Sequence, residues 1–153
     1  MKTPAALANL DTQIALLSEQ WGFFTETELV QHPGPGRWNK KEILGHLIDS
    51  AANNHRRFVL AQTVAESPLP LTPYDQDAWV QVSHYPALPS TDLLQLWTSY
   101  NRFLRQMLAM IPETALACEC FVFNNTLVTL DWLIDDYVLH LEHHVQQIIH
   151  EHD

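Results

Sequence analysis

Hydrophobic residues recur at helical spacing in four long segments of this chain. In the first segment, apolar side chains follow one another at intervals of three and four positions, which places them on one face of an α-helix: Leu7, Leu10, Ile14, Leu17, Trp21 and Phe24. The predicted helices run over about 4–30, 39–66, 91–111 and 129–151. Proline-containing breaks at 32–36, 67–68 and 112 end the first three, because proline cannot continue a helix. Asn39 is the expected N-cap of the second helix, with Glu42 three residues on.

These four helices predict an all-α protein built as a four-helix bundle, with residues 1–153 forming a single domain. The segment from Cys118 to Val128 is expected to add a short extended piece but no sheet. Its Cys-x-Cys spacing is too close for an easy disulfide in an extended segment, so Cys118 and Cys120 are interpreted as free, at least half-buried thiols.

A long crossover, from Ser67 to Pro89, connects the second and third helices and is rich in proline and aromatic residues. Loops of this length in compact domains are more often functional than merely connective. Two interpretations are open. The crossover is either a lid over one end of the bundle or a packed connection anchored by Trp79.

Charge and composition restrict the function. The net charge is -10, and the few basic residues form no cluster, so nucleic-acid binding is not expected. No apolar run approaches the roughly 18 residues that a membrane span needs, and no signal-peptide core is visible near the first residues. A cytoplasmic protein without a membrane partner is therefore predicted. Phosphate-binding glycine loops, Gly-x-Ser-x-Gly elbows and His-Glu-x-x-His motifs are all absent.

The best candidate for chemistry is a histidine pair in the fourth helix. His140 and His144 lie four positions apart, so their imidazoles can point at one metal ion from successive helical turns. His46 in the second helix offers a third ligand, and two helices would then leave open coordination positions, as in reactive metal sites. The alternative is coincidence, because five of the last fourteen residues are histidines.

The polar face of the second helix continues from His46 through Asp49, Asn53 and Arg57. One interpretation is a solvated face of an amphipathic helix. The other is a cavity lining, because the same face becomes apolar in its later turns, at Leu60. In that case Asp49, Asn53 and Arg57 are candidates for orienting a cosubstrate or tuning a metal ligand.

Four segments in order resemble the DinB-like superfamily, and its YfiT branch in particular: residues 37–50, 53–58, 73–79 and 136–148. The first resembles the opening of the family's second helix, and the last resembles its final-helix signature. The resemblance covers nearly the whole chain. It implies a four-helix bundle with a long crossover between helices 2 and 3, commonly assembled as a homodimer.

The resemblance also implies a metal held by three histidines, which match His46, His140 and His144 here. Members of the family are classed as metal-dependent hydrolases, while other relatives use low-molecular-weight thiols such as bacillithiol, mycothiol or glutathione. We therefore expect a metal-dependent enzyme that transfers such a thiol to an electrophilic small molecule. The alternatives are a metal-dependent hydrolase and a non-enzymatic metal- or ligand-binding stress-response bundle. Histidine ligands suit several divalent transition metals, and Zn or Ni is expected.

Overall fold

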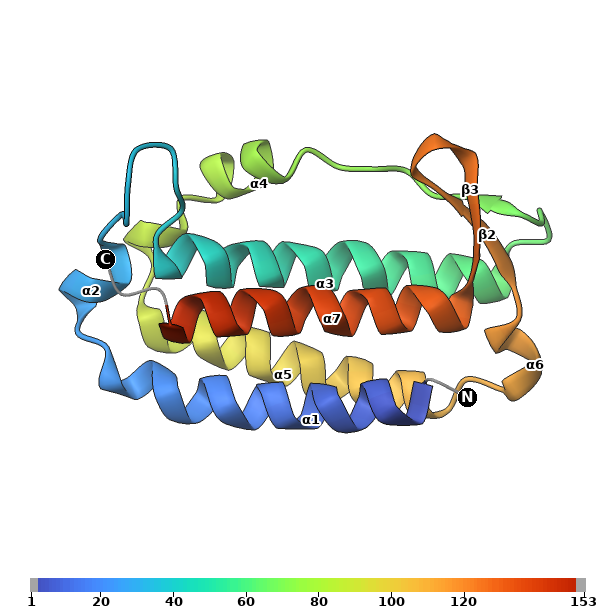
Figure 1. Ribbon diagram of the computed structural model, residues 1–153, viewed down its shortest axis with the longest axis horizontal. Helices are drawn as coiled ribbons and strands as arrows, with labels where there is room; N and C mark the ends of the chain where they lie inside the picture. Colours follow the sequence, from blue (N-terminus) through green and yellow to red (C-terminus); the bar gives the residue numbers. More distant parts are fainter. Residues whose placement is uncertain (1–2, 151–153) are drawn as a thin grey trace.

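A computed structural model describes residues 3–150, in which four long helices pack side by side (Figure 1). The long helices are α1 (Thr3–Gln20), α3 (Lys40–Thr63), α5 (Ser90–Ala109) and α7 (Leu130–His150). The short helices are α2 (Glu26–Val30), α4 (Gln76–Ser83) and α6 (Glu113–Leu116), with 3-10 turns η1 (Trp21–Phe23), η2 (Tyr85–Ala87) and η3 (Phe123–Asn125). The predicted four-helix bundle is confirmed. Residue 151, the predicted end of the last helix, lies outside the described residues.

Each long helix packs against two others, α1 and α3 each contacting both α5 and α7. The crossover returns the chain to the end where α3 began, so α3 and α5 run in the same direction, whereas α7 runs opposite to α3 (Figure 1). The first half of α3 therefore lies beside the last half of α7. The core between the helices is built from the predicted apolar faces, and Leu10, Leu47, Leu104 and Leu141 are almost completely buried.

The first predicted helix is interrupted, which corrects the continuous helix expected over 4–30. Phe24 and Thr25 adopt extended backbone conformations, and a new helix, α2, starts after them. Thr25 accepts a hydrogen bond from the Glu28 backbone N–H, and the Glu28 carboxylate accepts one from the Thr25 N–H. This capping box fixes a helix start, and therefore a bend, inside an otherwise periodic apolar pattern.

A small sheet closes one end of the bundle, where only an extended piece was expected. Its strands are β1 (Leu69–Pro70), β2 (Glu119–Val122) and β3 (Thr126–Thr129), in the order β1-β2-β3. β1 is parallel to β2, with Leu69 opposite Cys120, and β2 is antiparallel to β3. Cys118 is half-buried and Cys120 buried, both as free thiols, as predicted.

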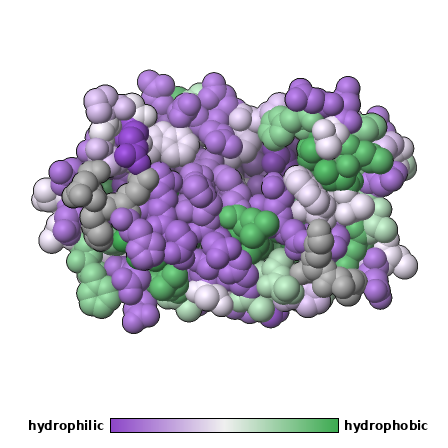
Figure 2. Space-filling model, viewed as in Figure 1, coloured by the Kyte–Doolittle hydropathy of each residue, from purple (hydrophilic) through white to green (hydrophobic). Residues whose placement is uncertain are grey.

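The face of the molecule seen in Figure 2 is mostly hydrophilic. Apolar atoms gather on it over the β2–β3 hairpin, where Phe123 and Leu127 are exposed. Within residues 3–150, no helix combines the length and the apolar character needed to cross a membrane.

Candidate metal centre

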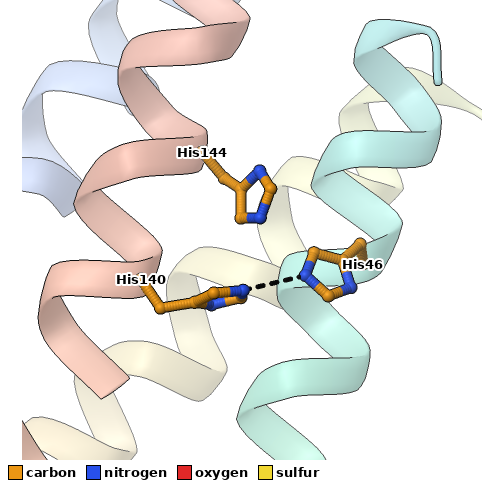
Figure 3. A group of neighbouring side chains, drawn as sticks. All are labelled: His46, His140 and His144. Atoms are coloured by element: carbon orange, nitrogen blue, oxygen red, sulfur yellow. Dashed lines mark hydrogen bonds between the residues drawn. The ribbon is translucent and has the colours of Figure 1, made fainter. Parts of the chain in front are cut away.

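Side chains from α3 and α7 bring the three predicted histidines together (Figure 3). His46 lies in the second turn of α3, and His140 and His144 lie on successive turns of α7. One ring nitrogen from each lies within 4.8 Å of the others. Three nitrogen atoms that close together can bind one metal ion.

The ring nitrogens that face one another can be identified. Nε2 of His46 lies 3.1 Å from Nε2 of His140. Nδ1 of His144 lies 2.8 Å from Oε1 of Gln147, which leaves its Nε2 for the centre. The three rings meet edge to face, with centroids 4.6 to 5.0 Å apart. Each histidine therefore offers one nitrogen to the same point.

Burial favours the neutral form of two of these imidazoles, those of His46 and His140. His46 is almost fully buried, and His140 and His144 are half-buried. Burial, with a further contribution from the neighbouring imidazoles, lowers the pKa of His46 to about 3 and that of His140 to about 4. A neutral imidazole has a free lone pair, which is the form that binds metal ions.

The first turn of α3 fixes its position against α7. The predicted cap is confirmed: Asn39 accepts from the Glu42 N–H at 2.9 Å, and Glu42 accepts from the Asn39 N–H at 2.8 Å. Lys40, which is buried, donates to the Ile148 carbonyl in the last turn of α7. The Trp38 ring lies 4.9 Å from the His46 ring and covers one side of it.

The crossover borders the end of α3 that carries His46, as the lid interpretation predicts, but its anchor is Tyr85. Trp79, the anchor expected from sequence, is 40% exposed and contacts the Tyr74 ring, whereas Tyr85 is 7% exposed. The Tyr85 ring lies directly against the backbone at Gly45. Lys41 holds the same end of the crossover by donating to the Leu88 carbonyl at 2.7 Å.

Tyr85 also reaches the polar row that continues from His46. Its hydroxyl donates to Oδ1 of Asp49 at 2.5 Å. Asp49 is buried, which raises its pKa, while the hydrogen bond from Tyr85 offsets part of that rise. Sequence reasoning counted Tyr85 only among the aromatic residues of the crossover and missed its contact with α3, because no periodic pattern links the two segments. The available signal was Gly45, a mid-helix glycine that periodicity does not explain.

Asn53 and Arg57 continue this row and are partly buried. Asn53 donates from its side chain to the Asp49 carbonyl at 2.9 Å. Arg57 donates to the Thr72 carbonyl at 3.2 Å, and its guanidinium lies 6.0 Å from the centre of the Tyr74 ring. Arg57 therefore lies beneath the crossover, whereas the hydrogen bond of Asn53 stays within α3. The interpretation of this row as a fully solvated face is wrong for Asp49, which is 5% exposed.

A family model described as the DinB superfamily matches residues 9–148. The chain belongs to the DinB superfamily. This DinB protein is 27% identical over 135 residues to the Bacillus subtilis protein named "Putative metal-dependent hydrolase YfiT", covering 88% of this chain and 75% of that one. A Bacillus pumilus protein named "Putative metal-dependent hydrolase" is 27% identical over 142 residues, covering 93% of this chain and 78% of its own length.

Two solved structures show the same fold. YfiT from Bacillus subtilis superposes with a TM-score of 0.85 at 22% identity, covering 95% of this DinB chain and 83% of that one. The mycothiol-dependent maleylpyruvate isomerase superposes with a TM-score of 0.76 at 15% identity. The match to the isomerase covers 97% of this chain and 61% of that one.

Proposed function

We propose that this protein is a metal-dependent enzyme that transfers a low-molecular-weight thiol to an electrophilic small molecule. The observation that carries the proposal is the group of three imidazoles with one nitrogen each at a common point, of which those of His46 and His140 are kept neutral by burial. The names of its sequence relatives, which mention a metal-dependent hydrolase, and of its structural neighbour, a mycothiol-dependent isomerase, support metal and thiol chemistry respectively.

His46, His140 and His144 fit a divalent transition metal. The Nε2 atoms of His46 and His140 face each other at 3.1 Å, and a metal between the rings would accept both lone pairs. Three imidazoles from two helices also leave coordination positions open for a substrate. Nitrogen ligands suit Zn, Ni, Fe or Cu, and we propose Zn or Ni.

The protein contributes uncharged metal ligands and the exclusion of water. A divalent metal held by these side chains would supply positive charge that stabilises a thiolate. An imidazole binds a metal as a neutral ligand, so these three side chains would not cancel that charge. Trp38 lies against the His46 ring and Tyr85 against Gly45, and we propose that both limit the access of water to the metal. The thiolate would attack the electrophilic carbon, forming a C–S bond as the leaving group departs with its electron pair.

Asp49, Asn53 and Arg57 are proposed to orient the thiol cosubstrate. They lie three, seven and eleven positions after His46, and so up to about 16 Å along the helix axis. A thiol the length of a tripeptide extends about 10 Å, which would place its polar end near Asn53. The Arg57 guanidinium, which keeps its charge in proteins, would attract a carboxylate at that end.

Hydrolysis is the second candidate, and the names of the sequence relatives favour it. The same positive charge would then stabilise hydroxide in place of a thiolate. The two reactions can be separated by their products. Metal-loaded protein is incubated with 1-chloro-2,4-dinitrobenzene and glutathione in water labelled with oxygen-18, and mass spectrometry then distinguishes a thioether from a labelled hydroxyl product.

A pair of adjacent histidines provides the matched control. His144→Ala should lose both metal retention and turnover, while its helical content stays unchanged. His143→Ala should lose neither, because His143 is exposed and points about 100° away around α7. Turnover should return when metal is restored to stripped wild-type protein. Equal metal loss in both variants would instead indicate unspecific binding by histidines, and full turnover in His144→Ala would refute the proposed site.

A further inference from the structure

Two buried polar atoms on adjacent turns of α3 have no hydrogen-bond partner among the described residues. They are Nδ1 of His46 and Oδ2 of Asp49. The two residues are 1% and 5% exposed, so bulk water does not satisfy these atoms. A buried polar atom without a partner destabilises the folded state, and such an atom needs an explanation in a folded protein.

One of the two atoms can donate a hydrogen bond and the other can accept one. Nε2 of His46 faces His140 and the centre, so in the neutral ring that offers this lone pair to a metal, the hydrogen is on Nδ1. A carboxylate oxygen can only accept. His46 and Asp49 are three positions apart on one helix, where side chains are neighbours.

The remaining oxygen of Asp49 is already fixed. Tyr85 donates to Oδ1 at 2.5 Å, and the Tyr85 ring cannot shift towards α3 because it lies against Gly45. Lys41, which donates to the Leu88 carbonyl, holds the end of the crossover that carries Tyr85. Tyr85 therefore holds the Asp49 carboxylate through Oδ1. The second oxygen, Oδ2, remains available to accept a hydrogen bond from His46 on the same helix.

We propose that Tyr85, Asp49 and His46 form a hydrogen-bonded chain that orients His46 towards the metal. In this chain, the Tyr85 hydroxyl donates to Oδ1 of Asp49, and Nδ1–H of His46 donates to Oδ2 when metal is bound at Nε2. Asp49 and Tyr85 are positioning residues, since they act through His46. The inference rests on the proposed metal centre and adds to it the groups that fix one ligand.

The metal affinity of metal-free protein tests this chain, measured as competition for Zn²⁺ with a chromophoric chelator. Outer partners of a metal-bound histidine typically change affinity by about 10–100-fold when removed. We expect Asp49→Ala to weaken Zn²⁺ binding in this range. Asp49→Asn, which removes the charge but keeps an oxygen, should have a smaller effect. Tyr85→Phe, which keeps the ring against Gly45, should also weaken binding, by less than Asp49→Ala.

Asp136→Asn is the matched control. It removes one carboxylate on α7, one turn before His140, and its affinity for Zn²⁺ should stay at the wild-type value. A second measurement separates positioning from general destabilisation. In protein with nitrogen-15-labelled histidine, the His46 Nδ1–H proton should be protected from exchange in the Zn²⁺ form, and Asp49→Ala should remove that protection.

Wild-type affinity in both Asp49→Ala and Tyr85→Phe would overturn the inference. If Asp49→Ala does not fold, Asp49→Asn and Tyr85→Phe still decide it. The failure of the metal centre gives a different result: wild-type protein would not bind Zn²⁺, or His144→Ala would bind it as tightly as wild type does.

Discussion

Replacing Gly45 by alanine should destabilise this protein, although alanine is normally the better helix residue. Gly45 lies in the first turns of α3, between Leu44 and His46. A Cβ added there would come well inside 3.0 Å of three atoms of the Tyr85 ring. Tyr85 is buried, and the ring and the new methyl group cannot occupy the same space. The ring, and with it the end of the crossover, must move outwards.

The expected magnitude is the balance of two opposing effects. Alanine in a helix interior is more favourable than glycine by about 1 kcal/mol. Losing the packing of a buried aromatic side chain costs about 3–5 kcal/mol. Gly45→Ala should therefore lower the free energy of unfolding by about 2–4 kcal/mol. In a Tyr85→Ala background the ring is absent, so the same substitution should raise it by about 1 kcal/mol.

Urea unfolding followed by circular dichroism measures all four proteins of this cycle in metal-free form. The reversal of sign is the diagnostic result, because a general effect on the helix would be the same in both backgrounds. The reasoning is refuted if Gly45→Ala is as stable as wild type, or if it destabilises the Tyr85→Ala protein equally. Gly45→Ala should also weaken Zn²⁺ binding, since it displaces the hydroxyl that holds Asp49.

Further predictions concern pH, helix capping, the crossover and assembly. In metal-free protein, the free energy of unfolding should fall as the pH drops from about 6.5 towards 4. The reason is that His46 and His140, with pKa values of about 3 and about 4 in the folded protein, take up protons more readily when unfolded. Urea unfolding across this pH range measures the change, and a constant free energy of unfolding would contradict the prediction. Asn39→Ala should cost about 1 kcal/mol of stability through the lost cap. Trp79→Ala should cost less than about 1 kcal/mol, because its side chain is 40% exposed. Light scattering should give twice the mass of one chain, and the mass of a single chain would exclude the homodimer.

The parts of the fold that sequence could predict depend on contacts close together in the chain. Apolar spacing and the Asn39–Glu42 capping box act within one or two helical turns, and α3 starts where they place it. The break before α2 carried the same kind of signal, in Thr25 and Glu28, but a continuous apolar pattern concealed it. The sheet could not be predicted, because β1 is two residues long and its partner strand lies some fifty positions away.

In the candidate site, too, the features that could be predicted depend on residues close together in the chain. The four-residue spacing of His140 and His144 is a local signal, whereas His46, about ninety positions away, was only a candidate third ligand until the family resemblance implied the same set. Tyr85 meets Asp49 across 36 positions that include the end of α3 and the whole crossover, and no periodic pattern predicts that contact. Gly45, which leaves room for the Tyr85 ring, can be read from the sequence. Its contact with Tyr85 can be recognised only from the structure, in which the crossover packs on α3.

The attachment of the crossover at both ends has a consequence for how the protein can evolve. Leu69 is paired with β2 at one end, and Tyr85 is packed on α3 at the other. Between them, from Thr72 to Trp79, only Tyr74 is even partly buried. Mutations in this stretch can alter the surface above α3 without moving either attachment. We expect relatives to differ most in this stretch, and a laboratory that sets out to change the substrate range should randomise it first.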